Sequence, residues 1–164
     1  MRADIDDALI ALFEGDPGAE ERLTGFGPDA FYRVMSLYRE RPGDFPGRLA
    51  ELISELGRES IDCWAHAISV VAWANPGIYV DQLGEPSTLD VVILGTIDDP
   101  RVVGILGGAL DREDWLIRYH AVRSLAARQE PEARQHLRAA LGDGEEMVRR
   151  EAKVALERPP GSPA

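Results

Sequence analysis

The chain has few of the features that mark a secreted, disulfide-linked or membrane-spanning protein. Its 164 residues include a single cysteine, Cys63, which excludes an intrachain disulfide framework. No run approaches the roughly 18 consecutive apolar residues that a membrane-spanning helix needs. The first residues are acidic and lack the basic-then-apolar order of a secretory signal. These absences predict a cytoplasmic protein that does not enter a membrane.

Positive charge is also scarce. The chain has 29 Asp and Glu against 18 Lys and Arg, a formal net charge of −11. Residues 1–97 carry seventeen acids and seven bases, whereas the remaining residues are nearly neutral. Because a phosphate backbone is bound by clustered Lys and Arg, this balance argues against a nucleic-acid partner. The excess of acids serves either solubility or a surface for a cationic partner protein.

The sequence does contain an internal repeat with a period of 31 residues. Apolar and charged positions of residues 99–125 recur, with matched chemistry, in residues 130–156. The recurring pairs are Pro100 with Pro131, Leu106 with Leu137, Ala109 with Ala140, Leu110 with Leu141, Ile117 with Val148, Arg118 with Arg149, Ala121 with Ala152, and Leu125 with Leu156. Eight pairs at one spacing indicate a duplicated structural unit.

Each copy predicts two helices joined by a turn. An acid followed by proline, as in Asp99-Pro100, suits the N-cap and first position of a helix. Asp143 and Glu146 have the spacing of a capping box at the start of a second helix. Apolar residues then recur at helical spacing. The residues expected to be buried are Leu106, Ala109, Leu110, Ile117, Ala121, Ser124 and Leu125 in one copy, and Leu137, Ala140, Leu141, Val148, Ala152, Ala155 and Leu156 in the other.

The shared pattern Trp/Glu-x-Ile/Val-Arg-x-x-Ala-x-x-x-Leu resembles HEAT repeats of the short bacterial type. The resemblance implies an all-α fold, a short right-handed α-solenoid of stacked antiparallel helix pairs with about eight or nine helices. It also implies that Arg118 and Arg149 bind acidic turn residues and have a structural role.

Weaker copies of the repeat are expected upstream. Ser87 and Asp90 form a capping box, and the apolar residues 91–97 that follow could be a buried strand or a helix. We expect a helix, because a second helix is due there by the 31-residue period. The predicted organisation is one domain over residues 1–157, with an N-terminal helical cap (1–58), a degenerate repeat (59–97) and two HEAT-like units (98–157). The proline-rich residues 158–164 are expected to be a disordered tail.

No residue set predicts catalysis, a metal or a cofactor. Cys63 and His66 lie one helical turn apart but lack the further ligands that a zinc site needs. Gly104, Gly107 and Gly108 do not form a nucleotide-binding glycine motif. Close helix packing, or close approach of a partner, is the expected reason for these glycines. The chain is therefore predicted not to be an enzyme.

Binding is the function class that remains, and we expect a protein–protein interaction module, for example an acidic inhibitor or immunity-type protein. Trp115, Tyr119 and Arg123 would share a helix face as a recognition patch, although packing inside the fold is the alternative role for Trp115. The second helices usually line the concave face of such repeats. Their outward positions are expected to include Arg101, Gly104, Gly108, Arg134, Gln135 and Arg138. The candidate partner-binding residues are Trp115, Tyr119, Arg123, Arg101, Arg134, Gln135, Arg138, Trp64 and Trp73.

An alternative function is a small-molecule or cofactor-handling helper of the lyase or chaperone kind. It would use a tryptophan-lined groove, and a pocket that brings Trp64, His66 and Trp73 together would favour it.

Overall fold

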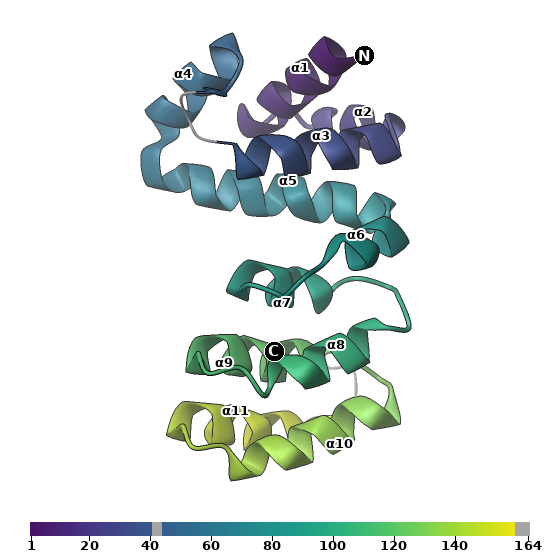
Figure 1. Ribbon diagram of the computed structural model, residues 1–164, viewed down its shortest axis with the longest axis vertical. Coiled ribbons are helices and arrows are strands. Elements are labelled where there is room, and N and C mark those ends of the chain that lie inside the picture. The colour runs from purple at the N-terminus through teal and green to yellow at the C-terminus, as the bar shows by residue number, and fades with distance from the viewer. Residues whose placement is uncertain (41–43, 160–164) are drawn as a thin grey trace. The chain divides into compact units, whose positions relative to one another are not determined.

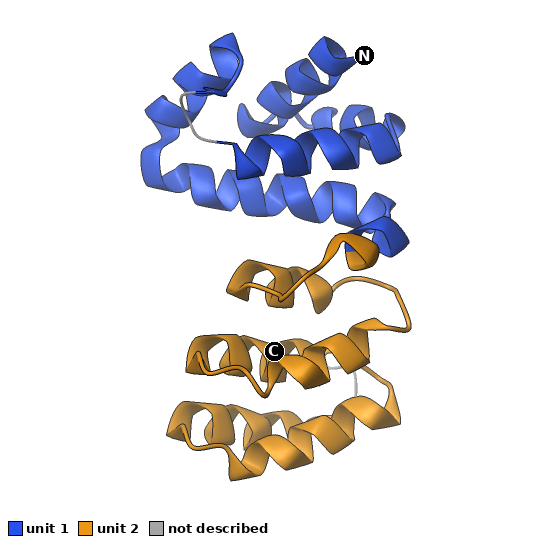
Figure 2. Cartoon of the chain, viewed as in Figure 1, with its two compact units in different colours: residues 1–79 blue, residues 80–164 orange. Residues whose placement is uncertain are grey.

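The computed structural model describes residues 1–40 and 44–159, and the regular elements in these ranges are all helices (Figure 1). The predicted all-α class is confirmed. The chain divides into two compact units, Met1–Tyr79 and Val80–Ala164 (Figure 2). Most of the predicted tail, from residue 160 onward, lies outside the described residues.

Unit 1 is built around one long helix. It contains α1 (Arg2–Phe13), α2 (Ala19–Gly25), α3 (Pro28–Arg39), α4 (Gly47–Leu56), the 3-10 helix η2 (Gly57–Glu59) and α5 (Ser60–Ala74), and the boundary between the units falls within α6 (Pro76–Gln82). The apolar helix α5 packs against α1, α2 and α3. The short helix α2 was not expected, so the described residues contain more helices than the predicted eight or nine.

Unit 2 contains the repeat. Its elements are α7 (Thr88–Leu94), α8 (Val102–Ala109), α9 (Trp115–Ala126), α10 (Pro131–Ala139), the 3-10 helix η3 (Ala140–Gly142) and α11 (Glu146–Glu157). Within each copy the first helix packs on the second, as α8 does on α9 and α10 on α11. Between copies, α9 packs against both α7 and α11, and α8 packs against α10 (Figure 1). The predicted stack of helix pairs is confirmed for this unit.

Helix α7 settles the segment that could have been a strand. Ser87 Oγ accepts a hydrogen bond from the Asp90 backbone N–H, and the Asp90 carboxylate accepts one from the Ser87 backbone N–H. This reciprocal capping box satisfies two donors at the helix start. The predicted helix is confirmed, but it ends at Leu94 rather than near Ile97.

The 31-residue period is also the period of the buried core. Leu106 and Leu137 are buried at equivalent places, as are Ala121 and Ala152. Three expected core residues are exceptions. Leu110, the C-cap of α8, is only half-buried. Leu141 is 43% exposed because it lies in η3, whose tighter 3-10 winding breaks the α-helical register of α10. Leu156 is only half-buried, since no described helix follows α11.

Helix starts differ between the two copies. Helix α10 begins at Pro131 as predicted, whereas α8 begins at Val102, two residues after its proline. Helix α11 begins at Glu146 and Glu145 is its N-cap, so the expected capping box of Asp143 with Glu146 is wrong. The Asp143 carboxylate instead accepts the backbone N–H of Glu145 at 2.8 Å, and it has a second partner described below.

Candidate protein-interaction surface

Three of the predicted binding residues lie along one side of α9. Trp115, Tyr119 and Arg123 follow one another at intervals of four residues, which places them on neighbouring turns of a helix. The Trp115 and Tyr119 rings are 6.4 Å apart between centres, and Arg123 Cζ lies 6.0 Å from the centre of the Tyr119 ring. Trp115 is 43% exposed. The structure therefore brings the three residues together, with Tyr119 and Arg123 half-buried.

A small cavity adjoins this patch, between α7 and α9. Its volume is about 240 Å³. Val92, Gly95 and Thr96 line it from one side, and His120, Arg123, Ser124 and Ala127 from the other. The two sides are held together by the Ser124 hydroxyl, which donates a hydrogen bond of 2.8 Å to the Val91 carbonyl.

Exposed apolar residues continue the surface along the stack. Leu116 and Met147 are 38% and 46% exposed, and they stand 31 residues apart at equivalent places of α9 and α11. Val92, 45% exposed, is the α7 equivalent of Arg123 by the same spacing. We call this surface the second-helix face. It is formed by Val92, Trp115, Leu116, Tyr119, His120, Arg123 and Met147.

The second-helix face is locally cationic in an acidic chain. Helix α9 contains no Asp or Glu. Burial, and then the nearby Arg123 charge, lower the pKa of His120 below its ordinary value, so this imidazole is neutral at pH 7. Arg123 forms no ion pair with any carboxylate in the described part of the chain. Among the residues that line the cavity, Arg123 is therefore the one that is charged at neutral pH, and its charge is positive.

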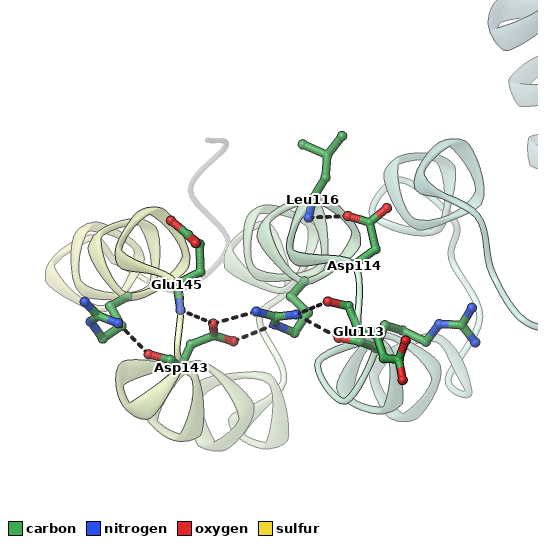
Figure 3. A network of polar contacts seen from close by, with 8 residues as sticks. Glu113, Asp114, Leu116, Asp143 and Glu145 are labelled. Carbon is green, nitrogen blue, oxygen red and sulfur yellow. Dashed lines mark hydrogen bonds and ion pairs between the residues drawn. The ribbon is translucent and has the colours of Figure 1, made fainter.

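Arg118 joins the two copies through a polar network that includes Glu113 and Asp143, which Figure 3 labels. Its guanidinium donates to both carboxylate oxygens of Asp143, at 2.8 and 3.0 Å, and to the carbonyls of Arg112 and Glu113, each at 2.8 Å. Arg149 donates to the Asp143 carbonyl at 2.7 Å. Arg118 also lowers the pKa of the Asp143 carboxyl. The predicted structural role of both arginines is confirmed.

The predicted residues Arg101, Arg134, Gln135 and Arg138 do not lie on second helices. Arg101 is the N-cap of α8, and the other three belong to α10, so these positions are on first helices and their expected placement is wrong. Gln135 and Arg138 are exposed.

Two of these arginines, Arg101 and Arg134, form hydrogen bonds with other residues of unit 2. Arg101 binds both carboxylate oxygens of Asp99, at 2.9 and 2.8 Å, and also Asp81. Its guanidinium and backbone N–H hold the pKa of Asp99 at about 2. Arg134 donates to the carbonyls of Leu156 and Arg158. Both arginines thus stabilise chain segments of unit 2.

The two tryptophans of unit 1 are not brought together. Trp64 is 7% exposed and packs in the core, with its ring centre 5.1 Å from that of Phe13 and 5.7 Å from that of Tyr38. Trp73 is 50% exposed. Nine residues of helix separate them, which is about half a turn out of phase. Because Trp64 is buried, it does not contribute to a binding surface. The two rings do not line a common groove.

Cys63 and His66, also on α5, have ordinary surroundings. Burial, followed by the charges of Asp62 and Glu59, raises the pKa of the Cys63 thiol, which disfavours the reactive thiolate. His66 Nε2 lies 3.0 Å from Glu20 Oε1. In the described residues, no three His, Cys, Asp or Glu side chains are grouped as ligands of a metal ion.

Several residues of the surface were not anticipated from the sequence. The residues around Val92 are all apolar, so the sequence does not distinguish this exposed side chain from its buried neighbours. The signal that could have found it is the repeat period, because position 92 aligns with Arg123. Leu116 and Met147 could have been found in the same way, as the apolar positions next to the predicted patch.

Comparison with known proteins agrees with this geometry. Residues 80–157 match the family model of HEAT repeats. No curated protein and no solved structure matches the chain. No helix in the described ranges is long and apolar enough to span a membrane.

The matched residues cover the whole helical stack of unit 2. The class that fold and comparison define together is a helical-repeat protein. Unit 2 is a HEAT-repeat domain, with its HEAT repeats in residues 80–157.

Proposed function

We propose that this protein is an interaction module that binds another protein through the second-helix face. HEAT repeats generally serve as scaffolds for protein interactions, and stacked repeats create extended binding surfaces. The observation that carries the proposal is the presence of four exposed large apolar residues on the second helices. Trp115 and Leu116 are adjacent on α9, Met147 is the α11 equivalent of Leu116, and Val92 is the α7 equivalent of Arg123. Grouped exposed apolar residues mark interaction sites more often than scattered ones do.

The composition of the face also suits a protein partner. Trp, Tyr and Arg are enriched among residues that dominate binding energy, and here one of each is adjacent on α9. The adjoining cavity, at about 240 Å³, is smaller than the roughly 300–1,000 Å³ of typical small-molecule sites. A single inserted side chain fits this size better than a cofactor does.

Two finer predictions rest on sequence alone. A cationic partner, as an acidic inhibitor or immunity-type protein would have, is suggested by the charge of residues 1–97. The small-molecule helper would need another site than the pairing of Trp64 with Trp73, because these rings lie on opposite sides of α5.

Affinity capture with matched variants tests the proposal. The tagged chain is compared with a Trp115→Ala, Leu116→Ser double variant, and with an Ile61→Ser, Trp73→Ala control that removes exposed apolar residues from unit 1. We expect a stoichiometric partner that the α9 variant loses and the control retains. Capture of the same proteins by all three chains, or of none by any, would contradict the proposal. Thermal unfolding of each variant checks that the fold is retained.

A further inference from the structure

The cavity beside Arg123 indicates what the partner should present. It is lined by apolar atoms of Val92 and Ala127 and by the neutral His120 ring. Its floor is fixed, because the Ser124 hydroxyl is bonded to the Val91 carbonyl and Gly95 packs directly on Ser124. A Cβ on Gly95 would stand 2.7 Å from Ser124 Oγ. A rigid apolar depression of this size accepts one apolar side chain.

Arg123 supplies the second element of recognition. Other arginines of unit 2, such as Arg118 and Arg112, are paired with carboxylates of the unit itself. Arg123 has no such pair in the described residues, and the Tyr119 ring lies beside its guanidinium. In a chain with an excess of acids, a guanidinium left without a carboxylate next to an apolar cavity is complementary to an anion supplied by a partner.

We propose that the second-helix face binds a peptide segment of a partner protein that inserts one apolar side chain into this cavity and pairs a nearby carboxylate with Arg123. The proposal rests on the proposed function and specifies the chemistry of the bound segment. The two groups must be close, because Arg123 itself lines the cavity. An apolar residue three or four positions from Asp or Glu on a partner helix has this spacing.

Selection from a phage-displayed random peptide library, followed by affinity measurement, tests the proposal. The full chain is the target. We expect the enriched peptides to share an apolar residue near an Asp or Glu. Replacing that acid by its amide should weaken binding to the wild type roughly tenfold. The same replacement should have little further effect on Arg123→Gln, since the double-mutant cycle isolates the pair. Arg138→Gln removes an equal charge from the exposed part of α10 and should leave affinity unchanged.

Each other outcome overturns the inference, and the outcomes separate it from the proposed function. Peptides that lose affinity with Trp115→Ala but not with Arg123→Gln would overturn the carboxylate pairing and leave the second-helix face as the binding surface. A loss with Arg138→Gln instead would move the partner to the first helices. Absence of enriched peptides, or binding indifferent to all α9 variants, would overturn both proposals.

Discussion

The imidazole of His136, on α10, occupies the space where a side chain of Gly107, on α8, would stand. A Cβ at Gly107 would overlap the ring, within 2.5 Å of Nε2 and 2.8 Å of Nδ1. The first helices of the two copies approach closely here because residue 107 is glycine. His136 Nε2 is buried and has no hydrogen-bond partner in the described residues, so packing, not polar bonding, holds the ring.

Gly107→Ala should therefore destabilise the protein. Overpacking of a filled interior typically costs about 1–3 kcal/mol, and we expect a loss of unfolding free energy in that range. Urea unfolding monitored by circular dichroism measures it. A variant as stable as the wild type would show that His136 moves aside at little cost.

Gly104→Ala and Gly108→Ala are the matched controls on the same helix. No atom lies within 4 Å of a Cβ built at either position, and both residues are exposed. Replacing a helical glycine by alanine in open space should stabilise by up to about 1 kcal/mol. The same urea experiment checks the sign, and destabilisation by either change would contradict the assigned packing.

Asp99 should make stability depend on pH. Its pKa lies at about 2, against an ordinary 3.8, because Arg101 binds the ionised form. A lowered pKa stabilises the fold above about pH 4, and this contribution is lost as the pH falls from 4 toward 2. We expect the unfolding free energy of the wild type to fall by up to about 2 kcal/mol more than that of Asp99→Asn across this window. Parallel pH profiles for the two proteins would contradict the account.

Asp143→Asn tests the tie between the two copies. The substitution replaces a mostly buried carboxylate by a neutral amide, so the Arg118 guanidinium loses its ion pair. Removing one partner of a fully buried ion pair lowers the free energy of unfolding by several kcal/mol. We expect a loss of about 1–3 kcal/mol here, because both side chains are partly exposed. Glu113→Gln is the control, since Arg118 binds only the backbone carbonyl of Glu113. Equal stability losses in both variants would contradict a specific role for the carboxylate.

Val92→Glu should prevent peptide binding to the cavity beside Arg123. Position 92 lines the same cavity as Arg123, so the introduced carboxylate can pair with the guanidinium and fill the space. We expect the affinity for a peptide selected by the wild type to fall at least about tenfold, without loss of thermal stability. Val92→Gln, of similar size but uncharged, separates the charge effect from simple filling.

The architecture of unit 2 could be predicted because the repeat period records which positions are buried. The structural role of Arg118 and Arg149 was implied by the resemblance to HEAT repeats, and their bonds to Asp143 agree with it. The close approach of the His136 ring to Gly107 could not be predicted, because these two residues are 29 positions apart and the repeat period is 31.

The surface was harder to predict than the core. Helical spacing predicts the patch of Trp115, Tyr119 and Arg123, but the face also includes Val92 of α7. The apolar sequence of α7 does not show that Val92 is exposed. Arg101 and Arg138 precede the turn of their copies, so the order of the sequence already assigns them to the first helices, where the structure has them.

The most direct test of the central claim is hydrogen exchange of the chain, free and bound to its captured partner. If the second-helix face is the binding surface, slower exchange should appear in α9, in the segment that includes α7 and Thr96, and at the start of α11 around Met147. The first helices α8 and α10 should be unchanged. Protection confined to α8 and α10, or to unit 1, would contradict the account.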